Sequence, residues 1–584
     1  MQSPLPFLSE YARLKKDQAG YLHPGLNQYI LQKIGSIRGS IQMNENYDDD
    51  LDYQRAAEER RKRRQKRRRR ERNMKLAFIT VILLLIAAGV LLFYQLVLKK
   101  GGRTVSTGSS QTVQDGNPSG EGQPDIIIGT EASDISGTDP AASSQSTEAA
   151  TEAVSITPET EAQTEAAAAA SGTEDILAQA DLLAQGYDYD GAMELLKTIP
   201  DYEANTAVTR AISDYQSAKD ACVAVDVTKV PHIFYHSLIN DTSAAFNVSV
   251  LGQSTVDGMN AWMTTVGEFD KITQQMYDNG YVFVRLRDLV VETTDENGNV
   301  HFEPNTQLLL PEGKKAVVLS VDDLSYYHSY EAASYPDKLV LDENGDVKCH
   351  YVKTDGTEEV GDFDVVPRLN TFLKEHPDGA YKGARGLIAL TGYNGVFGYR
   401  TDTDYRDKQN LMSDQAKWLD EHPEFDFDTE VAEATKIADA LKEEGWEFAS
   451  HTWGHLSVTN KTVDQLKRDN EKWVNTVQNI VGPVDTIIFA HGNDIGDWTG
   501  YSSDNEKYAY FSSAGYRFYC NVDSSQPYWV QISGSYVRQG RIDLDGYQLY
   551  QSSQGLTTVL DNMFLASQVF DSRRPTPVVA NGEA

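Results

Sequence analysis

The stretch AVVLSVDD, residues 316–323, is an apolar run that ends in two adjacent aspartates. Two further apolar runs follow the same plan, because WEFASH (446–451) and TIIFAH (486–491) each end in a histidine. Short apolar runs with polar ends are typical of strands that are buried on both faces. Active sites of parallel sheets and barrels lie where the strands end, so these aspartates and histidines are candidates for the chemistry.

The chain around these runs alternates strand patterns with helix patterns. Further strand candidates are PHIFYHS (231–237), YVFVRL (281–286) and GLIALTG (386–392). Apolar residues recur at helical spacing over 269–280 and again over 466–481. Strands that alternate with helices predict an α/β domain built on a parallel sheet or a barrel.

The sequence before this domain predicts a membrane anchor. Residues 76–98 are apolar and uncharged, and at about 1.5 Å per residue they are long enough to cross a bilayer. The basic run RRKRRQKRRRRERNMK (60–75) comes directly before them. Because positive charge stays on the cytoplasmic side, we expect a single-pass cell-membrane protein with a cytoplasmic region at 1–75. Everything after Leu98 would then lie outside the cell.

Two segments connect the predicted membrane helix to the α/β domain. Residues 99–172 are rich in Ser, Thr, Glu and Ala and contain almost no large apolar side chains. They cannot bury enough surface to offset the entropy of ordering, which predicts a disordered stalk. Residues 173–225 return to helical spacing in a pattern that resembles one tetratricopeptide-like hairpin. We expect a small helical neck that packs on the next domain.

Composition argues against some classes of function. The formal net charge is -33, which argues against nucleic acid as a partner of the whole chain. The three cysteines, Cys222, Cys349 and Cys520, form no C-x-x-C pair. The chain therefore contains neither a zinc-knuckle motif nor a thioredoxin-like redox motif. Composition gives no indication of the oligomeric state.

The residues at the predicted strand ends suit metal-assisted hydrolysis of an amide. His451 and His455 are four residues apart and lie near one another if the chain turns helically. A carboxylate from Asp322 or Asp323 would complete an Asp-His-His face with an open position for water. One aspartate would bind the metal, and the other would take a proton from the attacking water.

Other interpretations of the same residues stay open at this point. An aspartate pair at a strand end often serves as a turn or as a helix N-cap. Two histidines at this spacing are often unrelated residues of a surface or a core. The metal hypothesis is stronger because the aspartates and the histidines follow successive strand patterns in the order that one site would need.

The order of these motifs resembles the polysaccharide deacetylase family, also called the NodB-homology family or carbohydrate esterase family 4. Its motifs are T-F-D-D and H-[ST]-x-x-H; here the first reads SVDD (320–323) and the second HTWGH (451–455). Residues 230–239 are similar to the V-P-x-L-x-Y-H segment of many bacterial members. Residues 269–289 are similar to their F-x-x-Q-L-x-x-L-x-x-x-G-Y unit.

The resemblance implies a fold and a set of roles. It implies a distorted (β/α) barrel, which we place at 226–570, with Asp322 as the catalytic base. Asp323, His451 and His455 would be the ligands of a divalent metal, for which zinc is expected. The implied substrate is an N-acetylated polysaccharide of the cell envelope or an extracellular polysaccharide, since the stalk would hold the domain outside the membrane.

The chain also departs from the family pattern. Leu324 replaces the usual glycine after the aspartates, and FAHGND (489–494) replaces the third motif, F-x-Y-P-[FY]-G. The family's histidine general acid has no counterpart in the strand region 536–550. We therefore take His491 as the candidate proton donor. The alternative is a catalytically impaired glycan-binding module that retains the deacetylase fold and its metal site.

Overall fold

The computed structural model describes residues 158–330, 334–496 and 499–580 of the chain. The predicted cytoplasmic region (1–75), the predicted membrane helix (76–98) and the first part of the predicted stalk lie outside the described residues. Within the part that is described, no helix is both long enough and apolar enough to cross a membrane. The membrane topology stays a prediction.

The helical neck begins earlier than the sequence predicted. Helix α3 (Pro158–Gln185) is followed by α4 (Tyr189–Leu196) and α5 (Thr206–Asp220). Since α3 starts inside the segment predicted as disordered, the predicted end of the stalk at residue 172 is corrected to a point before α3. The reason is the alanine run 166–170, because alanine is the strongest helix former. A shortage of large apolar residues rules out a buried core but not a helix.

The neck contacts the α/β domain through a short polar and aromatic surface. The ring of Tyr187 stacks on the ring of Tyr381, with centroids 6.5 Å apart. The backbone N–H of Lys382 donates to the carbonyl oxygen of Gly186 at 2.7 Å. The ammonium group of Lys382 also lies 3.0 Å from the carboxylate of Asp188. These contacts tie the turn after α3 to the domain.

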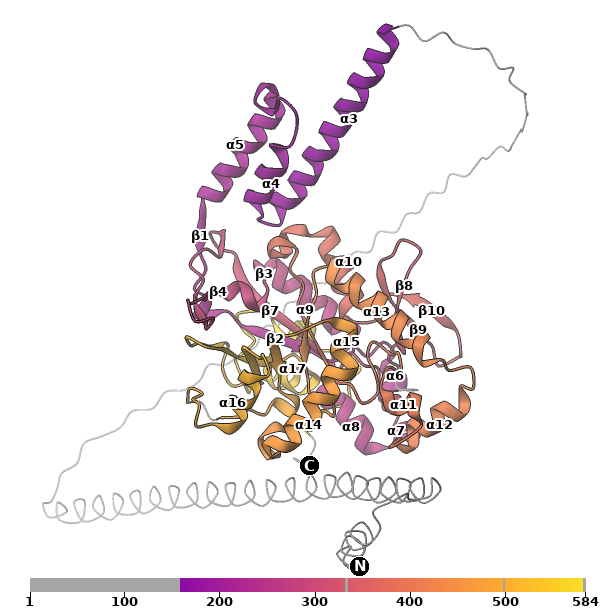
Figure 1. The fold of residues 1–584 in the computed structure, drawn as a ribbon. Helices are drawn as coiled ribbons and strands as arrows, with labels where there is room; N and C mark the ends of the chain where they lie inside the picture. Colours follow the sequence, from indigo (N-terminus) through magenta and orange to yellow (C-terminus); the bar gives the residue numbers. More distant parts are fainter. Residues whose placement is uncertain (1–157, 331–333, 497–498, 581–584) are drawn as a thin grey trace, which may run out of the picture. The chain divides into compact units, whose positions relative to one another are not determined.

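In the described part of the chain, seven parallel strands close into a barrel in sequence order. They are β2 (His232–Tyr235), β7 (Lys315–Asp322), β11 (Leu387–Leu390), β12 (Glu447–Ser450), β13 (Thr486–Ile488), β14 (Phe518–Val522) and β16 (Val537–Asp543). The barrel closes where β16, near the end of the chain, pairs with β2. Figure 1 shows helices outside these strands, for example α10, α13 and α14. The predicted (β/α) barrel is confirmed.

The barrel is distorted at β7. On one side this strand pairs with β2 from Val318 to Val321. On the other side its first residues pair with β3 (Tyr281–Phe283), whereas Ser320 to Asp322 pair with β11. The strand therefore changes neighbours halfway along. Its last residue, Asp322, lies between β2 and β11, at the end of the barrel where the strands finish.

Helix α9 (Val266–Asp278) shows how local sequence places a helix. It begins with a capping box, in which the Thr265 hydroxyl accepts from the backbone N–H of Glu268 and the Glu268 carboxylate accepts in return. It ends at Asn279 and Gly280, whose φ of 80° is a conformation that glycine adopts without strain. The apolar residues of its inner face are buried: Phe269, Ile272 and Met276.

The remaining elements surround the barrel. The helices are α6 (Thr242–Ala245), α7 (Val248–Leu251), α8 (Gln253–Trp262), α10 (Val365–Glu375), α11 (Thr403–Asp407), α12 (Ser413–Glu421), α13 (Phe427–Glu443), α14 (Val463–Trp473), α15 (Asn479–Val481), α16 (Glu506–Ser513), α17 (Gly546–Ser553) and α18 (Ala566–Val569). Outside the barrel path, β1 (Cys222–Ala224) pairs with β6 (Leu309–Pro311), and β4 (Val290–Thr294) pairs with β5 (Val300–Pro304). Strand β15 (Trp529–Ile532) pairs with the barrel strand β16.

Two features extend the predicted domain. The insertion after β7 is a three-stranded antiparallel sheet of β8 (Lys338–Leu341), β9 (Val347–Val352) and β10 (Glu358–Gly361). The predicted end of the domain at residue 570 is also too early. Arg574 is buried against Glu268 in an ion pair with both side chains 0% exposed. The last described segment is therefore part of the domain.

Candidate metal centre and active site

Asp323, His451 and His455 come together at the carboxyl ends of β7 and β12. Each offers one ligand atom, and these three atoms lie within 4.8 Å of one another. The Nε2 atom of His455 is 3.6 Å from Oδ2 of Asp323, and Nε2 of His451 is 4.0 Å from Oδ1. Strand β11 lies between β7 and β12, so the two ligand-bearing loops approach across its end.

The backbone explains how adjacent aspartates reach the same site. Asp322 is the last residue of β7, and Asp323 has a φ of 61°, in the left-handed region that is uncommon for residues other than glycine. Thr452 and His455 also have positive φ values, of 63° and 51°. Such backbone strain concentrates at functional sites. The turn at Asp323 leaves Oδ2 of Asp322 3.8 Å from Nε2 of His451.

Helix α14 supports the loop that carries both histidines. Asp469 on this helix accepts hydrogen bonds from the backbone N–H groups of Trp453 and Gly454, each at 2.8 Å. On the other side, Nδ1 of His451 lies 2.7 Å from the carbonyl oxygen of Ile488, to which it donates. The Nε2 atom of His451 is therefore the free lone-pair donor, and it faces the aspartates.

The environment keeps both imidazoles neutral. Burial lowers the pKa of His451 to about 4, although the nearby aspartates act in the opposite direction. Burial and the neighbouring His491 lower the pKa of His455 to about 3. Neutral imidazole is the form that binds metal ions. Two neutral imidazoles and one carboxylate match the donor set of hydrolytic zinc sites, where nitrogen ligands lie about 2.0–2.1 Å from the ion. The donor set therefore fits a divalent metal.

Asp322 has a partner that the sequence analysis missed, Arg541 on β16. The guanidinium group binds both carboxylate oxygens, with N–O distances of 2.7 and 2.9 Å. Burial by itself would raise the pKa of Asp322, but Arg541 and His451 outweigh it and hold that pKa well below its usual range. Asp322 is thus a permanent carboxylate. Its separation of 219 residues from Arg541 left no local pattern to find.

Arg541 is itself held inside the barrel. One of its nitrogens donates to the hydroxyl of Ser320 at 3.1 Å. That hydroxyl lies 3.0 Å from Nε2 of His232, whose Nδ1 is 3.0 Å from the side-chain oxygen of Gln539. These residues belong to β7, β2 and β16, three neighbouring strands. A buried hydrogen-bonded network therefore fixes the Arg541 side chain and, through it, Asp322.

His236 is a second residue to which the sequence analysis assigned no role. It follows β2 directly, and the register that pairs Tyr235 with Val321 places it level with Asp322. Its Nδ1 atom is buried and has no hydrogen-bond partner among the described residues. The histidine that ends the strand pattern PHIFYH was the available signal.

His491 lies at the edge of the site. Its ring packs edge-on against His455, with centroids 4.3 Å apart. Its Nε2 atom is 3.0 Å from the carbonyl oxygen of His455, to which it donates. The side chain is exposed, and its φ of 58° places it in the tight turn after β13. The predicted proton donor thus reaches the site, but one of its nitrogens is engaged by the backbone.

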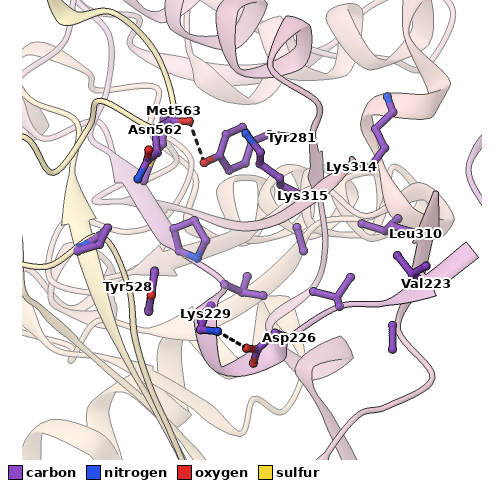
Figure 2. A pocket seen from close by; sticks show the side chains of 16 residues that line it. Val223, Asp226, Lys229, Tyr281, Leu310, Lys314, Lys315, Tyr528, Asn562 and Met563 are labelled. Carbon is purple, nitrogen blue, oxygen red and sulfur yellow. Dashed lines mark hydrogen bonds and ion pairs between the residues drawn. The ribbon is translucent and has the colours of Figure 1, made fainter. Parts of the chain in front are cut away.

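A cavity of about 310 Å³ lies at the other end of the barrel. It is lined by the first residues of β3 and β7, by β1 and by Lys229, Lys314 and Lys315 (Figure 2). Two of these ammonium groups face carboxylates, Lys229 that of Asp226 and Lys314 that of Asp378. None of the predicted site residues lines this cavity. It is separate from the candidate metal centre.

Comparison with known proteins gives a distant likeness to a solved structure. No protein-family profile and no curated protein sequence matches this chain. Among solved structures, the chain is similar to the Streptococcus pyogenes deacetylase PplD in complex with acetate. The identity is 15%, the match covers 55% of this chain and 97% of that one, and the TM-score is 0.27. At this level of likeness, function has to be argued from the geometry of the site.

Proposed function

We propose that this protein is a metal-dependent hydrolase that removes N-acetyl groups from a polysaccharide, with a barrel of the polysaccharide deacetylase type. The observation that carries the proposal is the position of Asp322 beside the cluster of Asp323, His451 and His455. A buried carboxylate next to a carboxylate-and-imidazole metal site is the arrangement that hydrolysis of an amide needs. The presence of this cluster where the barrel strands end supports the same conclusion.

Asp323, His451 and His455 would hold a divalent ion, and we expect zinc. When bound, such an ion acidifies water and polarises a carbonyl oxygen, which is the chemistry required for attack on an acetamide. The neutral imidazoles and the hydrogen bond from His451 to Ile488 orient the ligands for this role. The buried position of Asp323 and His451 keeps bulk water away from the reacting atoms.

Asp322 accepts the proton of the attacking water in this mechanism. Arg541 holds its carboxylate in one orientation and keeps it ionised. A carboxylate with a low pKa is a weak base, so the transfer depends on acidification of the water. The same pairing makes Asp322 a poor metal ligand, since Arg541 already binds both of its oxygens. Asp322 is therefore suited to act as the base, and Asp323 is suited to act as the metal ligand.

His236 is the residue that we propose donates a proton to the leaving amine, in place of His491. It lies at the end of β2, level with Asp322 in the strand register. Its Nδ1 has no hydrogen-bond partner among the described residues and is buried, so the ring would have to turn to reach the leaving amine through this atom. A donor needs an unengaged nitrogen within reach of the leaving group. One nitrogen of His491 is instead engaged by the carbonyl of His455. The proposed location, outside the cell on a single membrane helix, rests on the sequence alone.

Acetate release tests the proposal. The full-length protein is incubated with N-acetylated oligosaccharides, with and without a chelator, and released acetate is measured. Asp322→Asn and His236→Ala should each lower the rate by about 10²–10⁴-fold while zinc stays bound, because each removes a proton-transfer group. His491→Ala is the matched comparison and should lower the rate by less than about tenfold. A larger loss in His491→Ala than in His236→Ala would return the donor role to His491.

A folded, zinc-loaded protein that releases no acetate from any of these glycans would contradict the proposed activity. In that case the alternative, a catalytically impaired module that still binds glycan, becomes the better description. The observation that favours this alternative is the altered third motif, FAHGND, in which His491 packs against the proposed metal ligand His455.

A further inference from the structure

Tyr327 is a buried tyrosine whose hydroxyl group contacts the candidate metal ligand Asp323. The phenol oxygen donates to Oδ1 of Asp323 at 2.6 Å, and the side chain is only 6% exposed. The other carboxylate oxygen, Oδ2, lies 3.6 Å from Nε2 of His455. The two oxygens of Asp323 therefore have different neighbours. Oδ1 accepts from the phenol of Tyr327, whereas Oδ2 has no contact with the phenol and faces His455.

The hydroxyl of Tyr327 is held from behind. The Oγ1 atom of Thr391, which follows β11, lies 2.5 Å from it. Because the phenol proton goes to Asp323, Thr391 is the donor in this contact. The Thr391 hydroxyl is also 3.2 Å from the hydroxyl of Ser325. Both Thr391 and Ser325 are fully buried. A short chain of hydroxyl groups thus connects the end of β11 to the carboxylate of Asp323.

Aromatic packing fixes the Tyr327 ring as well. The ring of Tyr393 stacks on it, with centroids 5.1 Å apart and planes inclined by 15°. Tyr330 packs edge-on against it from the same loop, with centroids 5.5 Å apart. A phenol in such a position has little freedom to turn away.

The neighbouring residue provides an internal contrast. Tyr326 is also buried, at 1% exposure, but its hydroxyl donates to Asp364 at 2.8 Å, away from the metal ligands. Both tyrosines thus donate one hydrogen bond to one carboxylate. Only the partner differs, since Asp364 is the N-cap of α10 and Asp323 belongs to the candidate metal centre.

We propose that Tyr327 is a positioning residue of the metal centre. Its hydroxyl occupies Oδ1 of Asp323, so Oδ2 would be the oxygen left to hold the ion. A carboxylate that binds through one oxygen keeps a coordination position open for water, as a hydrolytic site needs. Hydrogen bonds to ligating carboxylates orient them, and their loss typically weakens metal affinity by about 10–100-fold. The inference rests on the metal centre of the proposed function, but not on its substrate.

Zinc affinity of the full-length protein tests this role. Wild type, Tyr327→Phe and Tyr326→Phe are stripped of metal, and zinc is titrated against a fluorescent chelator. Tyr327→Phe should raise the dissociation constant by about 10–100-fold. Tyr326→Phe removes an equally buried hydroxyl and should change the constant by less than about threefold. Thr391→Val, which removes only the group behind the phenol, should have a smaller effect than Tyr327→Phe.

Several outcomes overturn the inference. It fails if folded Tyr327→Phe binds zinc as tightly as wild type, or if Tyr326→Phe weakens binding by the same factor. It also fails, together with the metal centre, if the wild-type protein binds no zinc. Circular dichroism of each variant verifies the fold. Acetate release plays no part in this measurement, so an inactive protein with the expected zinc affinities would contradict only the proposed function.

Discussion

The two ends of the barrel both carry ion pairs, but in opposite surroundings. At the carboxyl end, Arg541 and Asp322 form a pair whose side chains are 1% and 3% exposed. At the amino-terminal end, beside the cavity of Figure 2, Lys314 and Asp378 form a pair whose side chains are 25% and 39% exposed. The N–O distances are similar, 2.7 and 3.0 Å. Exposure to water is what separates them.

The contrast in exposure indicates which charges the fold depends on. A charge taken out of water needs its partner, since the loss of either one leaves an uncompensated buried charge. A pair that stays in contact with water is worth little, because the solvent replaces the lost partner and salt screens the attraction. The carboxyl end should therefore be sensitive to single substitutions, and the amino-terminal end should tolerate them.

The largest effect is expected for Arg541→Met. It keeps a long apolar side chain but leaves Asp322 buried without its partner, which should lower the free energy of unfolding by about 3–5 kcal/mol. Urea denaturation measures the change. The double variant Arg541→Met with Asp322→Asn is the control, since removal of both charges should recover most of the loss. Equal destabilisation of the single and double variants would mean that packing, rather than the buried charge, is responsible.

A pH-dependent effect is expected for Asp364, which holds two loops of the carboxyl end. It accepts from the backbone N–H of Leu238, two residues after His236, and from the hydroxyl of Tyr326. Burial raises its pKa to about 6, above its ordinary value of 3.8. Between these two values the folded state binds more protons than the unfolded state. The contribution of Asp364 to stability should therefore fall as pH rises from about 4 to about 6.

Asp364→Asn removes this titration and is the means to measure it. As pH rises through this window, the unfolding free energy of wild type minus that of the variant should fall by up to about 1.4 kcal/mol per pH unit. Urea denaturation at about pH 4.5 and about pH 6.5 gives the two differences. A difference that stays constant, or that favours wild type more strongly at the higher pH, would contradict the assignment.

The smallest effect is expected for Lys314→Ala at the amino-terminal end. Since the pair with Asp378 is partly exposed, its loss should lower the free energy of unfolding by roughly 0–1 kcal/mol. Raising the salt concentration should shrink the difference further, because exposed pairs are screened. Urea denaturation at low and high salt measures both. A loss as large as that of Arg541→Met would remove the contrast between the two ends of the barrel.

Much of the fold was predictable from local sequence. The apolar runs at 231–237, 316–323, 386–392 and 446–451 all form barrel strands, because an apolar run of this length has to be buried on both faces. The histidines of HTWGH share one short loop, so their proximity needed only a local turn. The stalk boundary was wrong because composition decided whether a core could form, not whether a helix could.

The partners of the predicted residues were not predictable in this way. Arg541 meets Asp322 only because β16 pairs with β2 and β2 pairs with β7. The hydroxyl of Tyr327 turns to Asp323, whereas that of Tyr326 turns to Asp364. No pattern in the sequence distinguishes the two tyrosines. The two side chains diverge only in the folded chain, whose backbone has positive φ at both Asp323 and Tyr326.

Local sequence was enough to predict the strands, their order along the chain and the side chains that follow them. Which of those side chains meet, and which are removed from water, depends on the folded barrel. Hydrophobic periodicity is a property of neighbouring residues, whereas desolvation and ion pairing depend on distance in space. His236, Asp322 and Arg541 come together only when the barrel closes between β2 and β16.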